Sequence, residues 1–186
     1  MPIRFWWLPL ITFFVFPGCR RQEPYPIRFF REEVKIVIDS FRVTVAGTYH
    51  FKNLTNQSKT AKVCYPFPID EFHFYPDLIL TSEFDYTKND SGITLLKNFK
   101  PMAQESLSIL YQQKLKDRQV RYILLTTKHW QRPLTEARFV ISLPKDFKSP
   151  QFSYRPDSLR QQDQRRYYYL TKKNFFPKKD LIITWQ

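Results

Sequence analysis

The stretch FRVTVAGTYHF, residues 41–51, decides the fold. Apolar or small side chains stand at every second position in it, namely Val43, Val45, Gly47, Tyr49 and Phe51. Successive side chains of a β-strand point to opposite sides, so period two indicates a strand with one buried face. The stretch therefore predicts a strand whose other face, carrying His50, meets solvent.

The segments on either side continue this pattern. Val34, Ile36 and Ile38 alternate in the same way and predict an earlier strand. Residues 52–60, KNLTNQSKT, are rich in turn-forming Asn, Ser and Thr, and residues 61–67 are again apolar. We interpret the two runs on either side of this turn as a hairpin.

Further strand-like segments follow to the end of the chain, without amphipathic helices between them. They are residues 77–84, 92–99, 106–115, 120–126, 137–143, 151–155, 166–170 and 180–185. Residues 156–165 fit either a helix or an exposed loop. The pattern predicts an all-β fold, a single antiparallel β-sandwich of about ten short strands.

Composition agrees with a folded β domain. The 186 residues include 18 Phe and 11 Tyr but only 3 Gly and 2 Met. Aromatic residues favour strands and supply enough apolar area for a core. The length predicts one domain.

The first 18 residues have the pattern of a secretory signal peptide. Arg4 precedes the apolar run from Phe5 to Phe16, and the small residue Gly18 stands before Cys19. A positive start, an apolar middle and a small residue at the cut are the features that signal peptidases recognise. The run is too short for a membrane-spanning helix.

Gly18 and Cys19 also resemble the lipobox of bacterial lipoprotein precursors. In that family the cysteine after the small residue receives diacylglycerol and becomes the mature amino terminus. Phe16 and Pro17 depart from the usual Leu and small residue. The resemblance implies cleavage between Gly18 and Cys19 and lipidation of Cys19. The alternatives are ordinary cleavage, which leaves a thiol at Cys19, and an uncleaved anchor.

These features predict three segments: a signal peptide at 1–18, a lipidated terminus and tether at 19–32, and a β-sandwich domain at 33–186. Pro24 and Pro26 favour an extended tether. Cys64 is the only other cysteine. If Cys19 is acylated, we expect Cys64 to stand in a strand with its unpaired thiol in the hydrophobic core. Otherwise the two cysteines could form a disulfide.

Two weaker resemblances concern the domain. Residues 43–69, VTVAGTYHFKNLTNQSKTAKVCYPFPI, are similar to vault-type domains of the inter-alpha-trypsin inhibitor family. Residues 99–115 and 121–144 resemble uncharacterised exported bacterial β-sandwich proteins, in which a strand ending in Tyr-Gln precedes a Trp-containing loop. Both resemblances imply a fold and no catalytic residues.

One segment suggests a metal site. His73 stands near Asp70, Glu71 and Asp77 in the irregular loop IDEFHFYPD, and imidazole and carboxylate groups both bind zinc or manganese. The spacing matches no known metal motif. The competing interpretation, which we prefer, is a loop whose aromatic residues cover one end of the sandwich, with no metal and no cofactor.

The chain is basic, with a net charge of +13, and all but one of these charges lie after residue 18. Cations and aromatics alternate in residues 165–179, which favours an anionic glycan, a lipid head group or an acidic protein as partner. Nucleic acid is not expected outside the cytoplasm. The competing interpretation, which we prefer, is a strand followed by a charged turn. The cations of this candidate binding surface are Arg165, Arg166, Lys172, Lys173, Lys178 and Lys179.

No catalytic motif appears. Ser106 or Ser108 with a histidine and Asp117 would lack the Gly-x-Ser-x-Gly elbow of serine hydrolases, and glycine is scarce. We therefore expect a non-enzymatic binding or structural lipoprotein, held at a membrane of the bacterial cell envelope. The alternatives are an enzyme acting on an envelope polymer, a domain that pairs an exposed strand edge with a partner strand, and a secreted rather than anchored protein.

Overall fold

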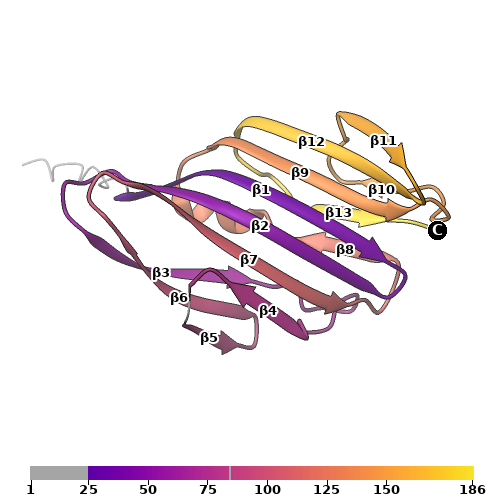
Figure 1. The fold of residues 1–186 in the computed structure, drawn as a ribbon, viewed down its shortest axis with the longest axis horizontal. Helices are drawn as coiled ribbons and strands as arrows, with labels where there is room; N and C mark the ends of the chain where they lie inside the picture. Colours follow the sequence, from indigo (N-terminus) through magenta and orange to yellow (C-terminus); the bar gives the residue numbers. More distant parts are fainter. Residues whose placement is uncertain (1–24, 84) are drawn as a thin grey trace, which may run out of the picture.

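The computed structural model describes residues 25–83 and 85–186, which form thirteen strands in three sheets and one short 3₁₀ helix (Figure 1). The strands of the seven-stranded sheet are, in spatial order, β11 (Ser158–Gln162), β12 (Arg165–Phe175), β9 (Leu134–Pro144), β1 (Ile27–Asp39), β2 (Arg42–Asn53), β7 (Gln104–Lys114) and β4 (Leu78–Thr81). One three-stranded sheet is β10 (Gln151–Phe152), β13 (Leu181–Thr184) and β8 (Gln119–Tyr122). The other is β3 (Lys59–Pro66), β6 (Gly92–Phe99) and β5 (Tyr86–Asn89).

The expectation of a mostly β chain is confirmed, but the large sheet is mixed. All its neighbouring strands are antiparallel except β1 and β9, which pair in parallel from Arg31↔Glu136 to Val37↔Ser142. The reason lies in the path of the chain. Once β7 has ended, the chain runs through β8 and the 3₁₀ helix η1 (Leu125–Trp130), which bring it back to the end of the sheet at which β1 begins. β9 therefore starts at the same end as β1. The prediction of purely antiparallel pairing is therefore wrong.

The expected hairpin between residues 41–51 and 61–67 is also wrong. β2 pairs with β1 and β7, whereas β3 pairs with β6 in a different sheet. Asn53 makes the corner, because its fully buried amide donates to the carbonyl oxygens of Gln57 and Phe99 at 2.7 and 3.2 Å. A corner fixed in this way turns the chain from one sheet into the other.

Two segment boundaries differ from the sequence-based expectation. β1 begins at Ile27, inside the expected tether 19–32, because Ile27 and Phe29 are core residues, 1% and 6% exposed. Residues 158–162, expected as helix or loop, form the exposed strand β11, which pairs with β12. The leader, the cleavage site and Cys19 lie outside the described residues.

The inner face of the large sheet packs against both small sheets. Aromatic pairs make these contacts: Tyr49 meets Tyr65 of β3 with ring centroids 5.4 Å apart, and Phe139 of β9 meets Tyr122 of β8 at 5.9 Å. Edge-to-face pairs of this kind stabilise a core beyond their buried area. The alternation predicted for β2 is confirmed, since its odd-numbered residues are buried and His50 lies on the other face.

Cys64 differs from its expected place. It lies on β3 as predicted, but Val63 points inward and Cys64 outward, so the thiol is exposed and is not part of the core. The period of two residues requires this, because neighbours in a strand face opposite sides. Within the described ranges, no helix is long and apolar enough to cross a membrane.

Candidate functional site

Glu32 carries a buried carboxyl group on β1. A bulge in that strand is the reason why its side chain faces the core. The pairing of β1 with β2 shifts register between Phe29 and Arg31, which leaves Phe30 as an extra residue. A bulge changes which residues of a strand face inward. Phe29 before it and Glu32 after it therefore both point to the core, and Glu32 is 2% exposed.

Three tyrosine hydroxyls extend from this carboxyl group in a chain. The hydroxyl of Tyr122, on β8, donates to Oε2 of Glu32 at 3.2 Å. The hydroxyl of Tyr49, on β2, lies 3.1 Å from that of Tyr122 and 2.7 Å from that of Tyr65, on β3. The network thus joins residues of all three sheets in the space between them.

The Glu32 carboxyl group is incompletely bonded. Its second oxygen, Oε1, is buried and has no hydrogen-bond partner among residues 25–83 and 85–186. Burial raises the pKa of Glu32 to about 7, although the hydrogen bond from Tyr122 acts to lower it. Burial also raises the pKa values of Tyr49, Tyr65 and Tyr122, so these hydroxyls stay protonated. Glu32 is therefore the member of the network that can change charge near neutral pH.

A cavity of about 60 Å³ lies against this network. Its wall combines the polar groups of Glu32 and the tyrosines with aromatic rings, of which Phe29, Phe51 and Trp130 pack together with centroids 5.1 to 6.0 Å apart. A few convergent polar groups in a mainly apolar concavity are the usual features of a small-molecule site.

The helix η1 positions Trp130 at this cavity. Asp180 holds the start of η1, because its Oδ1 accepts hydrogen bonds from the backbone N–H groups of Leu124 and Leu125 at 2.9 and 3.1 Å. At its other end, Trp130 contacts Phe51 of β2 and Tyr25 ahead of β1. The indole ring is thereby fixed from several directions.

A larger surface groove of about 430 Å³ adjoins the cavity. Cys64, Pro66, Thr126 and Trp130 line both spaces. The groove adds Lys62, His129 and Tyr25 to the lining. We refer to the cavity and the groove together as the Glu32 cleft, in which an inner acidic, aromatic chamber leads to an outer basic rim.

Gly47 leaves room for the Tyr49 ring. A β-carbon at position 47 would lie 2.1 Å from the Tyr49 hydroxyl oxygen, which is far closer than a side chain permits. Any larger residue here would have to displace a ring that is held by two hydrogen bonds. The glycine in the middle of a long strand thus serves the site, although glycine weakens a strand.

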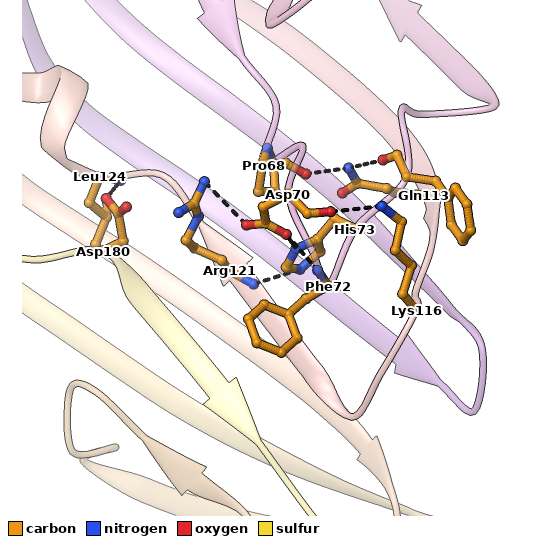
Figure 2. A network of polar contacts seen from close by, with 10 residues as sticks. Pro68, Asp70, Phe72, His73, Gln113, Lys116, Arg121, Leu124 and Asp180 are labelled. Atoms are coloured by element: carbon orange, nitrogen blue, oxygen red, sulfur yellow. Dashed lines mark hydrogen bonds and ion pairs between the residues drawn. The ribbon is translucent and has the colours of Figure 1, made fainter.

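His73 belongs to a separate network, in which both of its ring nitrogens are bonded (Figure 2). Its ring is fully buried, Nδ1 donates to Oδ1 of Asp70 at 2.6 Å, and Nε2 accepts from the backbone N–H of Arg121 at 3.1 Å. Burial lowers the pKa of His73 despite the nearby Asp70. The imidazole is therefore neutral and ties the loop that follows β3 to β8.

The other candidate metal ligands are not gathered around it. Asp77 forms an ion pair with Arg42 at 3.2 Å, and Glu71 is exposed. In the part of the chain that the structure describes, no three His, Cys, Asp or Glu side chains form a group that could hold a metal ion. The structure brings together only His73 and Asp70 of the four residues, and both ring nitrogens of His73 are occupied.

The two arginines of the candidate anionic-ligand surface have structural partners. Arg165 donates to Oγ of Ser142 at 2.7 Å and pairs with Asp39 at 2.8 Å. Arg166 donates to the carbonyl oxygen of Phe147. Both arginines thereby fix the end of β12.

The lysines of that surface lie elsewhere. Lys172 pairs with Asp157 at 3.7 Å, and Lys173, Lys178 and Lys179 are exposed. Arg165 and Lys173 are eight residues apart on one strand, which is roughly 26 Å. The six cations thus form two groups, at opposite ends of β12, and the exposed lysines lie in the group at and after its carboxyl-terminal end.

The Glu32 cleft was not predicted from the sequence. A signal for Glu32 was present, because it is in phase with Val34, Ile36 and Ile38 and so shares their predicted buried face. Tyr49 was placed on the inner face of its strand. No sequence pattern joins Tyr65 and Tyr122 to them, because β3 and β8 belong to other sheets.

Comparisons with known proteins give information about the fold and not about the function. No protein-family model matches the sequence, and no curated protein matches it. Among solved structures, the chain is similar to a protein of Legionella pneumophila described as a "putative nutrient binding protein", with a TM-score of 0.62 and 16% identity over 87% of this chain and 67% of that one.

The chain is also similar to M1 zinc metallopeptidases. One from Deinococcus radiodurans gives a TM-score of 0.54 at 6% identity over 86% of this chain. A second structure, of a two-domain M1 enzyme bound to L-tryptophan, gives 0.52 at 8% identity. This chain spans only 42% and 43% of those two proteins. At such identities the likeness shows a shared fold and no shared activity.

Proposed function

We propose that this protein is a binding module of the bacterial cell envelope, held at a membrane through lipidated Cys19, and that it binds a small molecule in the Glu32 cleft. The three sheets form one β-sandwich in this proposal. The observation that carries it is the buried, half-bonded carboxyl group of Glu32 at an aromatic cavity beside a surface groove. Leaving a buried oxygen unbonded costs about 1–3 kcal/mol, so a ligand that bonds it gains affinity.

The geometry supports binding better than hydrolysis of an envelope polymer. Glycoside hydrolases use two carboxyl groups on either side of the scissile bond. Among the described residues, Glu32 is the only acidic side chain that lines either the cavity or the groove. A binding role is also the one named in the description of the Legionella protein of this fold.

Cys64 provides a direct test, because it is an exposed free cysteine and a lining residue of both the cavity and the groove. The full chain in mild detergent is treated with a thiol reagent, with and without the small-molecule fraction of the cell envelope, and labelling of the Cys64 peptide is followed by mass spectrometry. We expect that fraction to slow the labelling of Cys64.

The matched control is a Phe41→Cys variant, whose thiol would stand at an 80% exposed position in the turn between β1 and β2. Its labelling should be unaffected. Equal labelling of Cys64 with and without the fraction would contradict a binding role for the cleft. Chemical conversion of a compound in the fraction would instead support the enzyme alternative.

A further inference from the structure

The polarity of the Glu32 cleft indicates its ligand class, and this inference rests on the proposed binding role. We propose that the inner cavity takes the head group of a small primary ammonium ion, whose alkyl stem lies in the outer groove.

The direction of the hydroxyl chain leaves an acceptor without a donor. Each tyrosine hydroxyl has one hydrogen. Tyr122 gives its hydrogen to Glu32, so it must accept from Tyr49, which in turn must accept from Tyr65. All three hydrogens are thus used, so none of these hydroxyls can also bond Oε1 of Glu32, which has no partner among the described residues and is open to a donor from a ligand. An ammonium group, with three N–H donors and no acceptor, meets that requirement.

The charge and the rings of the cavity favour a cation. Among the described residues, Glu32 is the only Asp, Glu, Lys, Arg or His that lines the inner cavity. Phe29, Phe51 and Trp130 surround it with aromatic surface, and the faces of such rings attract ammonium groups. A buried carboxylate and aromatic faces therefore act in the same direction, and a neutral alcohol would gain less from either.

The volumes of the cavity and the groove indicate which part of the ligand each of them holds. A cavity of about 60 Å³ is small, since one water molecule needs roughly 10–15 Å³ of such space, and it therefore admits a small group rather than a whole ligand. The groove of about 430 Å³ has room for an alkyl stem or a larger attached group. The ligand is therefore expected to have a narrow cationic end.

Binding of a cation should depend on pH through Glu32. The titratable side chains lining the cavity with it are Tyr49 on β2, Tyr65 and Cys64 on β3, Tyr111 on β7 and Tyr122 on β8. Burial raises the pKa values of all four tyrosines, so they stay neutral. The pKa of Glu32 is about 7, so the carboxylate fraction, and with it the affinity, rises about tenfold from pH 6 to pH 8.

The test is calorimetric titration of the full chain in mild detergent with three probes: n-butylammonium, tetramethylammonium and n-butanol. Alkylammonium ions stay charged over this pH range, as lysine does. We expect n-butylammonium to bind best and to bind about tenfold more tightly at pH 8 than at pH 6. Tetramethylammonium, which lacks an N–H donor, and the neutral alcohol should bind at least tenfold more weakly.

Two variants separate Glu32 from its surroundings. Glu32→Gln should weaken n-butylammonium binding at least tenfold and abolish the pH dependence. Glu33→Gln is the matched control, because Glu33 is the next residue, faces outward and pairs with Arg31. Its binding should equal that of the unmodified chain, whose own pH dependence tests the proposal even if Glu32→Gln does not fold.

Failure of the ammonium class and failure of the binding role have different results. If n-butanol binds as well as n-butylammonium, or if Glu32→Gln binds it unchanged, the ammonium class is wrong while the cleft remains a binding site. If none of the probes binds, the ammonium class is again overturned. Protection of Cys64 by the envelope fraction then shows separately whether the binding role survives.

Discussion

Glu32 and His73 are both buried ionisable side chains, but they differ in how completely the protein satisfies their hydrogen bonds. Both ring nitrogens of His73 have protein partners, and burial lowers its pKa, so the neutral form is fully accommodated. One oxygen of Glu32 is bonded and the other is not, and burial raises its pKa to about 7. A satisfied group stabilises the fold, whereas an unsatisfied one at a cavity indicates a binding role.

The raised pKa of Glu32 has a consequence for stability. Its pKa of about 7 in the folded chain exceeds the ordinary value of 4.5, so the folded state holds the proton more tightly than the unfolded state. The resulting contribution to the free energy of unfolding is complete below about pH 4.5 and is lost as the pH rises through 7.

We therefore predict that the unmodified chain loses about 2 to 3 kcal/mol between pH 5 and pH 8 relative to Glu32→Gln, which has no titrating group at this position. Urea unfolding of both proteins across this range measures the difference. Glu33→Gln should follow the unmodified chain. Parallel curves for Glu32→Gln and the unmodified chain would show that Glu32 does not titrate near neutral pH.

At the scale of elements, local pattern was sufficient for strands and insufficient for their partners. The alternation in residues 41–51 identified β2 and its buried face, because the period of a strand is a local property. The pairing of β3 with β6 depends on the corner at Asn53, which requires the carbonyl groups of Phe99 and Lys100 from a distant part of the chain. Contacts of that range leave no trace in local periodicity.

The candidate site shows the same division. Glu32 and Tyr49 are paired neighbours on β1 and β2, and alternation places both on the inner face. The cavity, however, arises only when Tyr65 of β3 and Tyr122 of β8 meet them from two other sheets. In the charged segment 165–179, too, local sequence did not reveal the partners, since its two arginines bond residues that are distant in sequence.

At the scale of the whole molecule, the folded β region follows a segment, residues 1–18, that the sequence predicts to be a signal peptide. We predict that the protein is recovered with membranes and that its Cys19 peptide carries acyl chains. Cys19→Ser should release the domain into the soluble fraction, as shown by cell fractionation and immunoblotting, while Cys64→Ser, the matched control, should stay with membranes. Recovery of an unacylated Cys19 peptide from the mature protein would refute the lipid anchor.

The central claim is that the Glu32 cleft binds an ammonium group through the free carboxylate oxygen of Glu32. The most direct measurement is an NMR titration of the ¹³C-labelled Glu32 carboxyl group in the full chain, with and without saturating n-butylammonium. We expect a pKa of about 7 in the free protein, and a clearly lower pKa when the ammonium group stabilises the charged form. A Glu32 carboxyl group that titrates at the same pH with and without n-butylammonium would contradict the claim.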